Sequence, residues 1–97
     1  MLLANLSAPK VLVGESLRAG RFQIPLSAIG DIEVLDRERF GRLIGPEANP
    51  AAQLMIRGDV KQGARLFISD PSDPTPYVII SSRRPEQLIA AIDANRP

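Results

Sequence analysis

The chain has 97 residues, of which 44% are hydrophobic, so it is long enough to build one small core but not two. We therefore expect a single domain over residues 1–97, with residues 1–9 as a poorly specified N-terminal segment. Lys and Arg together number 12 and Asp and Glu 11, which leaves a net charge of +1. Such a balance gives no general attraction to nucleic acid, and we expect no nucleic-acid partner.

Cysteine and histidine are both missing from the composition. Their absence excludes disulfides and thiolate nucleophiles, and it leaves the chain without the commonest general base and the commonest transition-metal ligand. The sequence therefore predicts a protein that is not an enzyme, with no catalytic residues, no metal site and no cofactor.

Apolar residues are frequent over residues 1–13, but Asn5, Ser7, Pro9 and Lys10 interrupt them. The longest uninterrupted run is far below the roughly 18 residues that span a bilayer. We expect the chain as given to be soluble.

The first strand signals lie in residues 10–13 and 21–26. In the second run Phe22, Ile24 and Leu26 alternate with polar residues and proline, the period of two expected of a strand with one buried face. Because Pro25 has no N–H to donate, it must lie at a sheet edge, at a bulge or at an outward-facing gap in the hydrogen bonding.

Residues 29–35 alternate again and predict another strand, with Gly30 marking a bulge. Residues 36–44 then favour one or two helical turns. Asp36 is the expected N-cap of this helix, and Gly45-Pro46 ends it.

Two further apolar runs, residues 53–57 and 64–69, flank a connection with glycine at both ends, Gly58 and Gly63. This arrangement is typical of an open hairpin. We expect the two runs to pair antiparallel.

The C-terminal third begins with two Asp-Pro pairs, Asp70-Pro71 and Asp73-Pro74, which predict rigid turns capped by the aspartates. Residues 77–82 carry apolar side chains on both faces, as a strand with a neighbour on each side does. Pro85 suits the first position of a final helix. Its apolar stripe consists of Leu88, Ile89, Ala91 and Ile92.

Short strands followed by one amphipathic helix predict a mainly β fold with a C-terminal α-helix. We expect a small pleckstrin-homology-like architecture, either a partly closed barrel or twisted sheets capped by the helix.

The pattern DPxDPTPYxxxSxRxPExL, which starts at Asp70, carries a family resemblance. The residues that match it are Asp70, Pro71, Asp73, Pro74, Thr75, Pro76, Tyr77, Ser81, Arg83, Pro85, Glu86 and Leu88. Over residues 14–94 the chain resembles an actinobacterial membrane-protein family of unknown function. The resemblance implies a cytosolic domain of the pleckstrin-homology-like type behind two transmembrane helices. It therefore implies a location on the cytoplasmic side of the cell membrane, with membrane association through segments absent from this chain.

Arg83 and Arg84 precede the predicted final helix, where guanidinium groups and free backbone N–H groups can hold an anion such as phosphate. The competing interpretation is that these arginines are solvated or paired with nearby acids, Asp70, Asp73 or Glu86. We name Arg83 and Arg84 as the candidate anion-binding residues.

Three more arginines, Arg37, Arg39 and Arg42, fall on the earlier helix. Because Asp36 and Glu38 lie between them, the local charge is mixed, which favours a solvated face over a basic binding face.

The residues thus favour a non-catalytic interaction or assembly module. Its partner is expected to be an unknown protein or a second copy of the chain, recruited by strand pairing or by a patch on one sheet face. The alternative is binding of an anionic ligand or lipid headgroup at the Arg83/Arg84 corner.

Overall fold

The computed structural model describes residues 2–4, 11–19 and 22–96, and within these ranges it contains eight strands and three helices. The strands are β1 (Leu2–Ala4), β2 (Val11–Val13), β3 (Ser16–Ala19), β4 (Phe22–Pro25), β5 (Ile29–Leu35), β6 (Gln53–Met55), β7 (Gly63–Ile68) and β8 (Tyr77–Ser81). The helices are the 3-10 helix η1 (Leu26–Ala28) and the α-helices α1 (Arg37–Ile44) and α2 (Pro85–Asn95).

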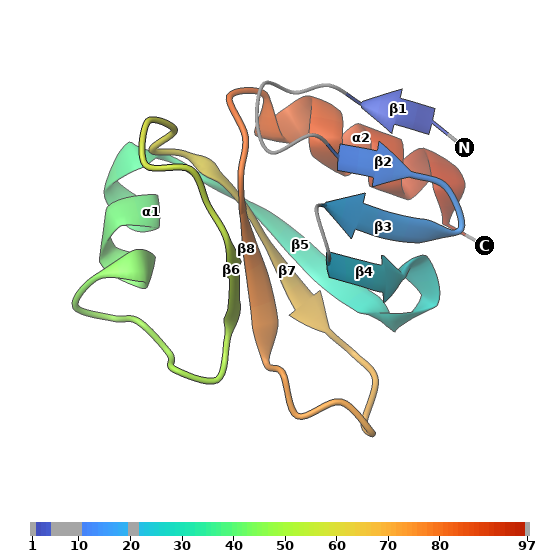
Figure 1. Cartoon of the computed structure of the whole chain (residues 1–97), viewed down its shortest axis with the longest axis horizontal. Helices are drawn as coiled ribbons and strands as arrows, with labels where there is room; N and C mark the ends of the chain where they lie inside the picture. The colour runs from blue at the N-terminus through green and yellow to red at the C-terminus, as the bar shows by residue number, and fades with distance from the viewer. Residues whose placement is uncertain (1, 5–10, 20–21, 97) are drawn as a thin grey trace.

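The strands form two sheets, ordered β1-β2-β3-β4 and β5-β7-β8-β6 (Figure 1). Each sheet has four strands, and no pairing between the described strands joins the two sheets into a closed barrel. The predicted mainly β fold with a C-terminal helix is confirmed. Of the two architectures expected, the partly closed barrel is not formed, and separate sheets accompanied by a helix describe the molecule.

Sheet β5-β7-β8-β6 is covered on both faces. One face packs against the first sheet and α2, and this cluster comprises Val13, Leu17, Ile24, Leu26, Ile29, Ala64, Leu66, Val78, Ile80, Leu88, Ala91 and Ile92. The other face packs against α1 through a smaller cluster of Leu35, Phe40, Leu43, Tyr77 and Ile79. The first four residues of β8 alternate between the two clusters, which is why all four are buried. The predicted two-sided burial of this strand is confirmed.

The predicted pairing of residues 53–57 with residues 64–69 is wrong. β7 already has two antiparallel neighbours, β5 and β8. The strand β6 therefore cannot pair with β7, and it joins the sheet at the far side of β8 in parallel, with Leu54 opposite Ile79. The glycines at residues 58 and 63 flank a loop that crosses from the sheet edge to its centre instead of a hairpin.

Several local predictions are confirmed. The Asp36 carboxylate caps α1 by accepting a hydrogen bond from the backbone N–H of Arg39 at 2.8 Å. Asp70 and Asp73 each accept from the backbone N–H two residues later, both at 2.9 Å, and so cap their turns. The register of β5 shifts between Ile29 and Ile32, as expected of a bulge near Gly30.

Candidate functional site

A cleft of about 430 Å³ opens beside the β6–β7 loop, the start of α1 and the turn that leads from β8 into α2. Its lining residues are Arg37, Asp59, Val60, Lys61, Gln62 and Arg83. Three of these side chains are cations and one is a carboxylate, so the cleft has a positive balance although the whole chain is close to neutral.

The β6–β7 loop is held in place by the buried Ser81 at the end of β8. The Ser81 hydroxyl accepts a hydrogen bond from the backbone N–H of Arg57 at 3.0 Å and donates to the carbonyl oxygen of Val60 at 3.4 Å. The side chain of Val60 is itself only 2% exposed. One buried serine thus fixes both ends of the segment that carries Asp59.

The other wall of the cleft is tied to the same loop. Ser82 donates its backbone N–H to the carbonyl oxygen of Gln62 at 2.9 Å, and the Gln62 amide donates to the carbonyl oxygen of Arg83 at 3.0 Å. These reciprocal bonds place Arg83 beside the loop. The cleft therefore has a fixed backbone frame, and the charged side chains that line it are exposed to solvent.

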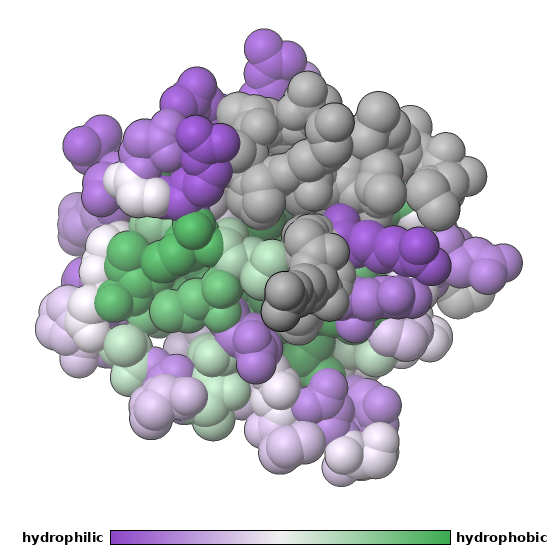
Figure 2. All heavy atoms as spheres, in the orientation of Figure 1, coloured by the Kyte–Doolittle hydropathy of each residue, from purple (hydrophilic) through white to green (hydrophobic). Residues whose placement is uncertain are grey.

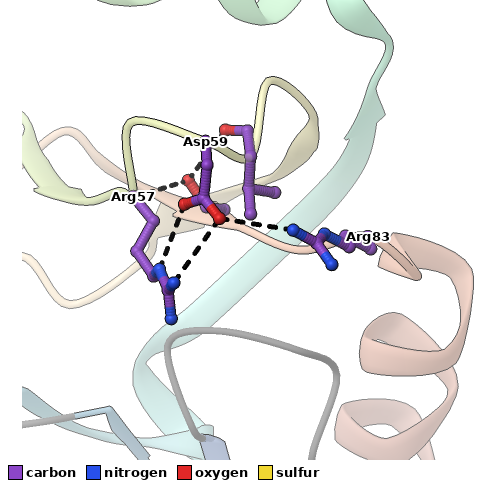
Figure 3. A network of polar contacts seen from close by, with 5 residues as sticks. Arg57, Asp59 and Arg83 are labelled. Carbon is purple, nitrogen blue, oxygen red and sulfur yellow. Dashed lines mark hydrogen bonds and ion pairs between the residues drawn. The ribbon is translucent and has the colours of Figure 1, made fainter.

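Asp59 bridges two arginines, as Figure 3 shows. One carboxylate oxygen lies 3.1 Å from Nε of Arg57, and the other lies 3.3 Å from a terminal nitrogen of Arg83. The pKa of Asp59 is lowered, first by a hydrogen bond from its own backbone N–H and then by the hydrogen bond and charge of Arg57 and the charge of Arg83. All three side chains are more than half exposed, so solvent screens their attraction and the bridge can open.

The two arginines named from the sequence have different positions. Arg83 lines the cleft, whereas Arg84 is exposed and is not among the lining residues. The acid that pairs with Arg83 is Asp59, not Asp70, Asp73 or Glu86.

The start of α2 offers fewer free donors than the sequence suggested. Pro85 has no N–H, and the N–H groups of Gln87 and Leu88 both donate to the carbonyl oxygen of Arg84. Among the first residues of α2 this leaves the backbone N–H of Glu86 as the free donor, and the negative charge of the Glu86 side chain lies in the same turn. Any anion bound here is therefore held by the side chains of the cleft and not by the end of the helix.

Sequence reasoning missed Arg37 and Lys61 as members of this group. The mixed local charge predicted for α1 is confirmed for two of its arginines, because Arg39 pairs with Glu33 at 3.9 Å and Arg42 with Glu38 at 3.7 Å. Arg37, at the first position of the same helix, lines the cleft instead. No local pattern marks this difference, since it depends on which loop passes the start of α1.

A second feature is the outer edge of β6, the last strand in its sheet. Leu54 in this strand and Ile56, just after it, are 42% and 39% exposed. Figure 2 shows a green apolar patch on the side of the molecule where Figure 1 draws α1 and β6. At the opposite edge of the sheet, Arg96 donates to the carbonyl oxygens of Ile29 and Gly30 at 3.0 and 2.8 Å. The β5 edge is thus partly capped, and the described residues provide no such cap for β6.

Within the described residues, no three His, Cys, Asp or Glu side chains gather as metal ligands. None of the helices in the described ranges combines the length and the apolar character that crossing a membrane requires.

The fold and the cleft define a small β-rich domain with two open sheets, a C-terminal helix and a basic surface hollow. The chain belongs to the family described as "Protein of unknown function (DUF3093)", which matches residues 1–92. Membership of a family of unknown function is thereby confirmed. No curated protein and no solved structure matches the chain.

Proposed function

We propose that this protein is a non-catalytic interaction or assembly module that docks through the outer edge of β6, and that the docked partner is a second copy of the chain. The observation that carries the proposal is the exposure of Leu54 and Ile56, 42% and 39%, beside a strand edge that is open in the described structure. An open edge presents unpaired N–H and C=O groups, and apolar side chains next to it favour pairing with another strand.

A second copy fits this edge because antiparallel pairing of β6 with itself is self-complementary. A twofold axis would bring Leu54 beside Leu54 of the partner subunit and would extend both sheets into one. The net charge of +1 opposes such an approach only weakly. Since β6 has only three residues, the interface would be smaller than the roughly 1,000 Å² expected of a stable complex. The expected dimer is weak.

A membrane anchor would compensate for this weakness. The proposal includes attachment to the cytoplasmic side of the cell membrane through segments outside this chain, as the resemblance to an actinobacterial membrane-protein family implies. The pleckstrin-homology-like part of that resemblance stays a part of the proposal, and the mainly β fold with a C-terminal helix is compatible with it. Tethering raises the effective concentration of the domains to about the millimolar range, enough for a weak contact to form.

Sedimentation velocity over a series from micromolar to millimolar protein tests the docking edge. The wild-type chain should show a mass that rises with concentration, and the double variant Leu54→Ser, Ile56→Ser should stay monomeric. Val34→Ser is the matched control, because Val34 is 44% exposed but lies on β5, at the other end of the sheet. A wild-type chain that remains monomeric throughout, or a double variant that associates equally, contradicts the proposal.

The cleft favours a second candidate function, binding of an anionic ligand or lipid headgroup. Arg83 remains a proposed ligand, and Arg37 and Lys61 join it in place of Arg84 because they share the cleft lining. Three cations that line one hollow of about 430 Å³ suit a phosphate group better than a dispersed surface charge does.

The neighbouring arginines give this candidate a matched test. Arg83→Gln and Arg84→Gln remove the same charge from adjacent positions, and only the first lies in the cleft. Titration with inorganic phosphate, followed by amide NMR shifts, should lose most of its affinity in Arg83→Gln and little in Arg84→Gln. Equal losses in the two variants would mean that net charge, not the cleft, governs binding.

A further inference from the structure

We propose that the carboxylate of Asp59 is a built-in competitor for the cleft, which occupies the guanidinium of Arg83 until a phosphate group displaces it. This inference rests on the second candidate function, anion binding in the cleft. It adds that the Asp59 carboxylate limits the affinity of the cleft for anions. It also names the chemical class of the ligand, a phosphate group carried by a soluble molecule or by a lipid headgroup.

The geometry of Asp59 is that of a tethered anion. Arg57 contacts both of its oxygens, with Nε 3.1 Å from one and a terminal nitrogen 3.4 Å from the other. The second oxygen also lies 3.3 Å from a terminal nitrogen of Arg83 (Figure 3). Guanidinium groups make the same type of charge-assisted hydrogen bond to a carboxylate and to a phosphate. The Asp59 carboxylate therefore already uses donors that a phosphate in the cleft would need.

The bridge can open without disturbing the fold. The side chains of Arg57, Asp59 and Arg83 are 56%, 53% and 58% exposed, so each can turn into water without leaving a buried charge unpaired. The backbone beneath them is fixed separately by Ser81 and Gln62. Exchange of a carboxylate for a phosphate thus requires side-chain rotation alone.

Two further cations in the cleft give a phosphate group contacts that the Asp59 carboxylate does not make. Lys61 and Arg37 line the same hollow, whereas the ion pairs of Asp59 are made with Arg57 and Arg83. A phosphate carries up to two negative charges and three or more acceptor oxygens, so it can contact Arg83 and these additional cations together. A single carboxylate on a short side chain holds only the arginines beside it.

The test compares Asp59→Asn with the wild-type chain. Asparagine keeps the size of the side chain but removes the charge that competes for Arg83 and repels phosphate. At a separation of several ångströms in a largely solvated site, that charge change is worth about a tenfold gain in phosphate affinity. Asp31→Asn is the charge-matched control, because Asp31 is exposed on β5 and precedes Arg37 by six residues, roughly 20 Å along an extended chain. The control should change the affinity by less than about threefold, as long-range screening implies.

Two probes separate the sources of the phosphate group. Inorganic phosphate is titrated against each variant by amide NMR shifts, and vesicles of phosphatidylcholine with and without phosphatidic acid are tested by co-sedimentation. A gain in Asp59→Asn with phosphate supports a soluble ligand, and a gain only with phosphatidic acid vesicles supports a headgroup. Urea unfolding of each variant checks that the fold is unchanged.

The outcomes also separate this inference from the function on which it rests. If the wild-type chain binds through Arg83 but Asp59→Asn binds no more tightly, the competitor role is overturned and anion binding stands. If neither chain binds either probe, both are overturned. If Asp59→Asn gains affinity and Arg83→Gln loses it, both are supported.

Discussion

Substitution of Gly63 by alanine should severely destabilise this domain. Gly63 is buried at the start of β7, where it pairs with Leu35 of β5 on one side and Ser81 of β8 on the other. A Cβ at this position would overlap the carbonyl oxygen of Ile80 and would lie 2.8 Å from its carbonyl carbon and 3.1 Å from Cα of Ser81. These are backbone atoms, so no rotamer change relieves the overlap, and β8 itself must move.

The magnitude follows from the kind of atoms involved. Overpacked side chains in a core cost about 1–3 kcal/mol, and displacement of a central strand lies at or above the upper end of that range. We expect a loss of about 3 kcal/mol or more, against a total stability of about 5–15 kcal/mol for a domain of ordinary stability. With a urea m-value of about 1–2 kcal/mol/M, the unfolding midpoint should fall by about 2 M.

Gly41→Ala is the matched control. A Cβ added to Gly41 meets nothing within 4 Å, and the residue is exposed inside α1. Alanine should therefore stabilise the helix by about 0.5–1 kcal/mol. Urea unfolding followed by far-UV circular dichroism measures both variants. A loss below about 1 kcal/mol for Gly63→Ala would refute the close approach of β7 and β8 on which the reasoning depends.

Three other changes have defined outcomes. Ser81→Ala should lower the free energy of unfolding by about 1–2 kcal/mol in urea, because the buried hydroxyl bonds both the N–H of Arg57 and the carbonyl oxygen of Val60; an unchanged midpoint would mean that the loop is held by other contacts. Leu88→Ala should cost about 2–5 kcal/mol, since this side chain is 0% exposed in the core beneath α2; a thermal midpoint near that of the wild type would contradict docking of the helix. The pKa of Asp70 is lowered by hydrogen bonds from the hydroxyl and backbone N–H of Ser72, so its stabilising effect should be present above the ordinary value of 3.8 and be lost as the pH falls through the lower folded-state pKa. In Ser72→Ala the pKa of Asp70 should return toward 3.8, as measured by the NMR shift of its carboxyl carbon. An unchanged pKa would exclude the Ser72 hydroxyl as the cause of the lowering.

Local patterns predicted the local parts of this fold. The period of two found β4 and β5, and a run with apolar residues on both faces found β8. Asp36 capped α1 as expected, and Pro85 began α2 at its first position. Each of these features depends on residues within a few positions of one another, where backbone sterics and short hydrogen bonds dominate. Such signals are legible in a single sequence.

The pairing of β6 and the cleft were not predictable in this way. The place of β6 depends on β7 having both of its sides occupied by β5 and β8, a fact of the whole sheet. The cleft joins Asp59 to Arg83, 24 residues apart, through a loop whose glycines suggested a hairpin. From the sequence, Arg84 is as plausible a ligand as its neighbour Arg83, but in the structure only Arg83 lines the cleft. Side chains that meet in a cleft from distant parts of the chain do not form a periodic pattern in the sequence.

The most direct test of the proposed assembly edge is an amide NMR series on the chain from micromolar to millimolar concentration. Shift changes should grow with concentration and should centre on residues 53–56, whose strand would pair with β6 of a second copy. Changes that centre on β4, at the edge of the first sheet, or spectra that do not change with concentration would contradict docking through β6.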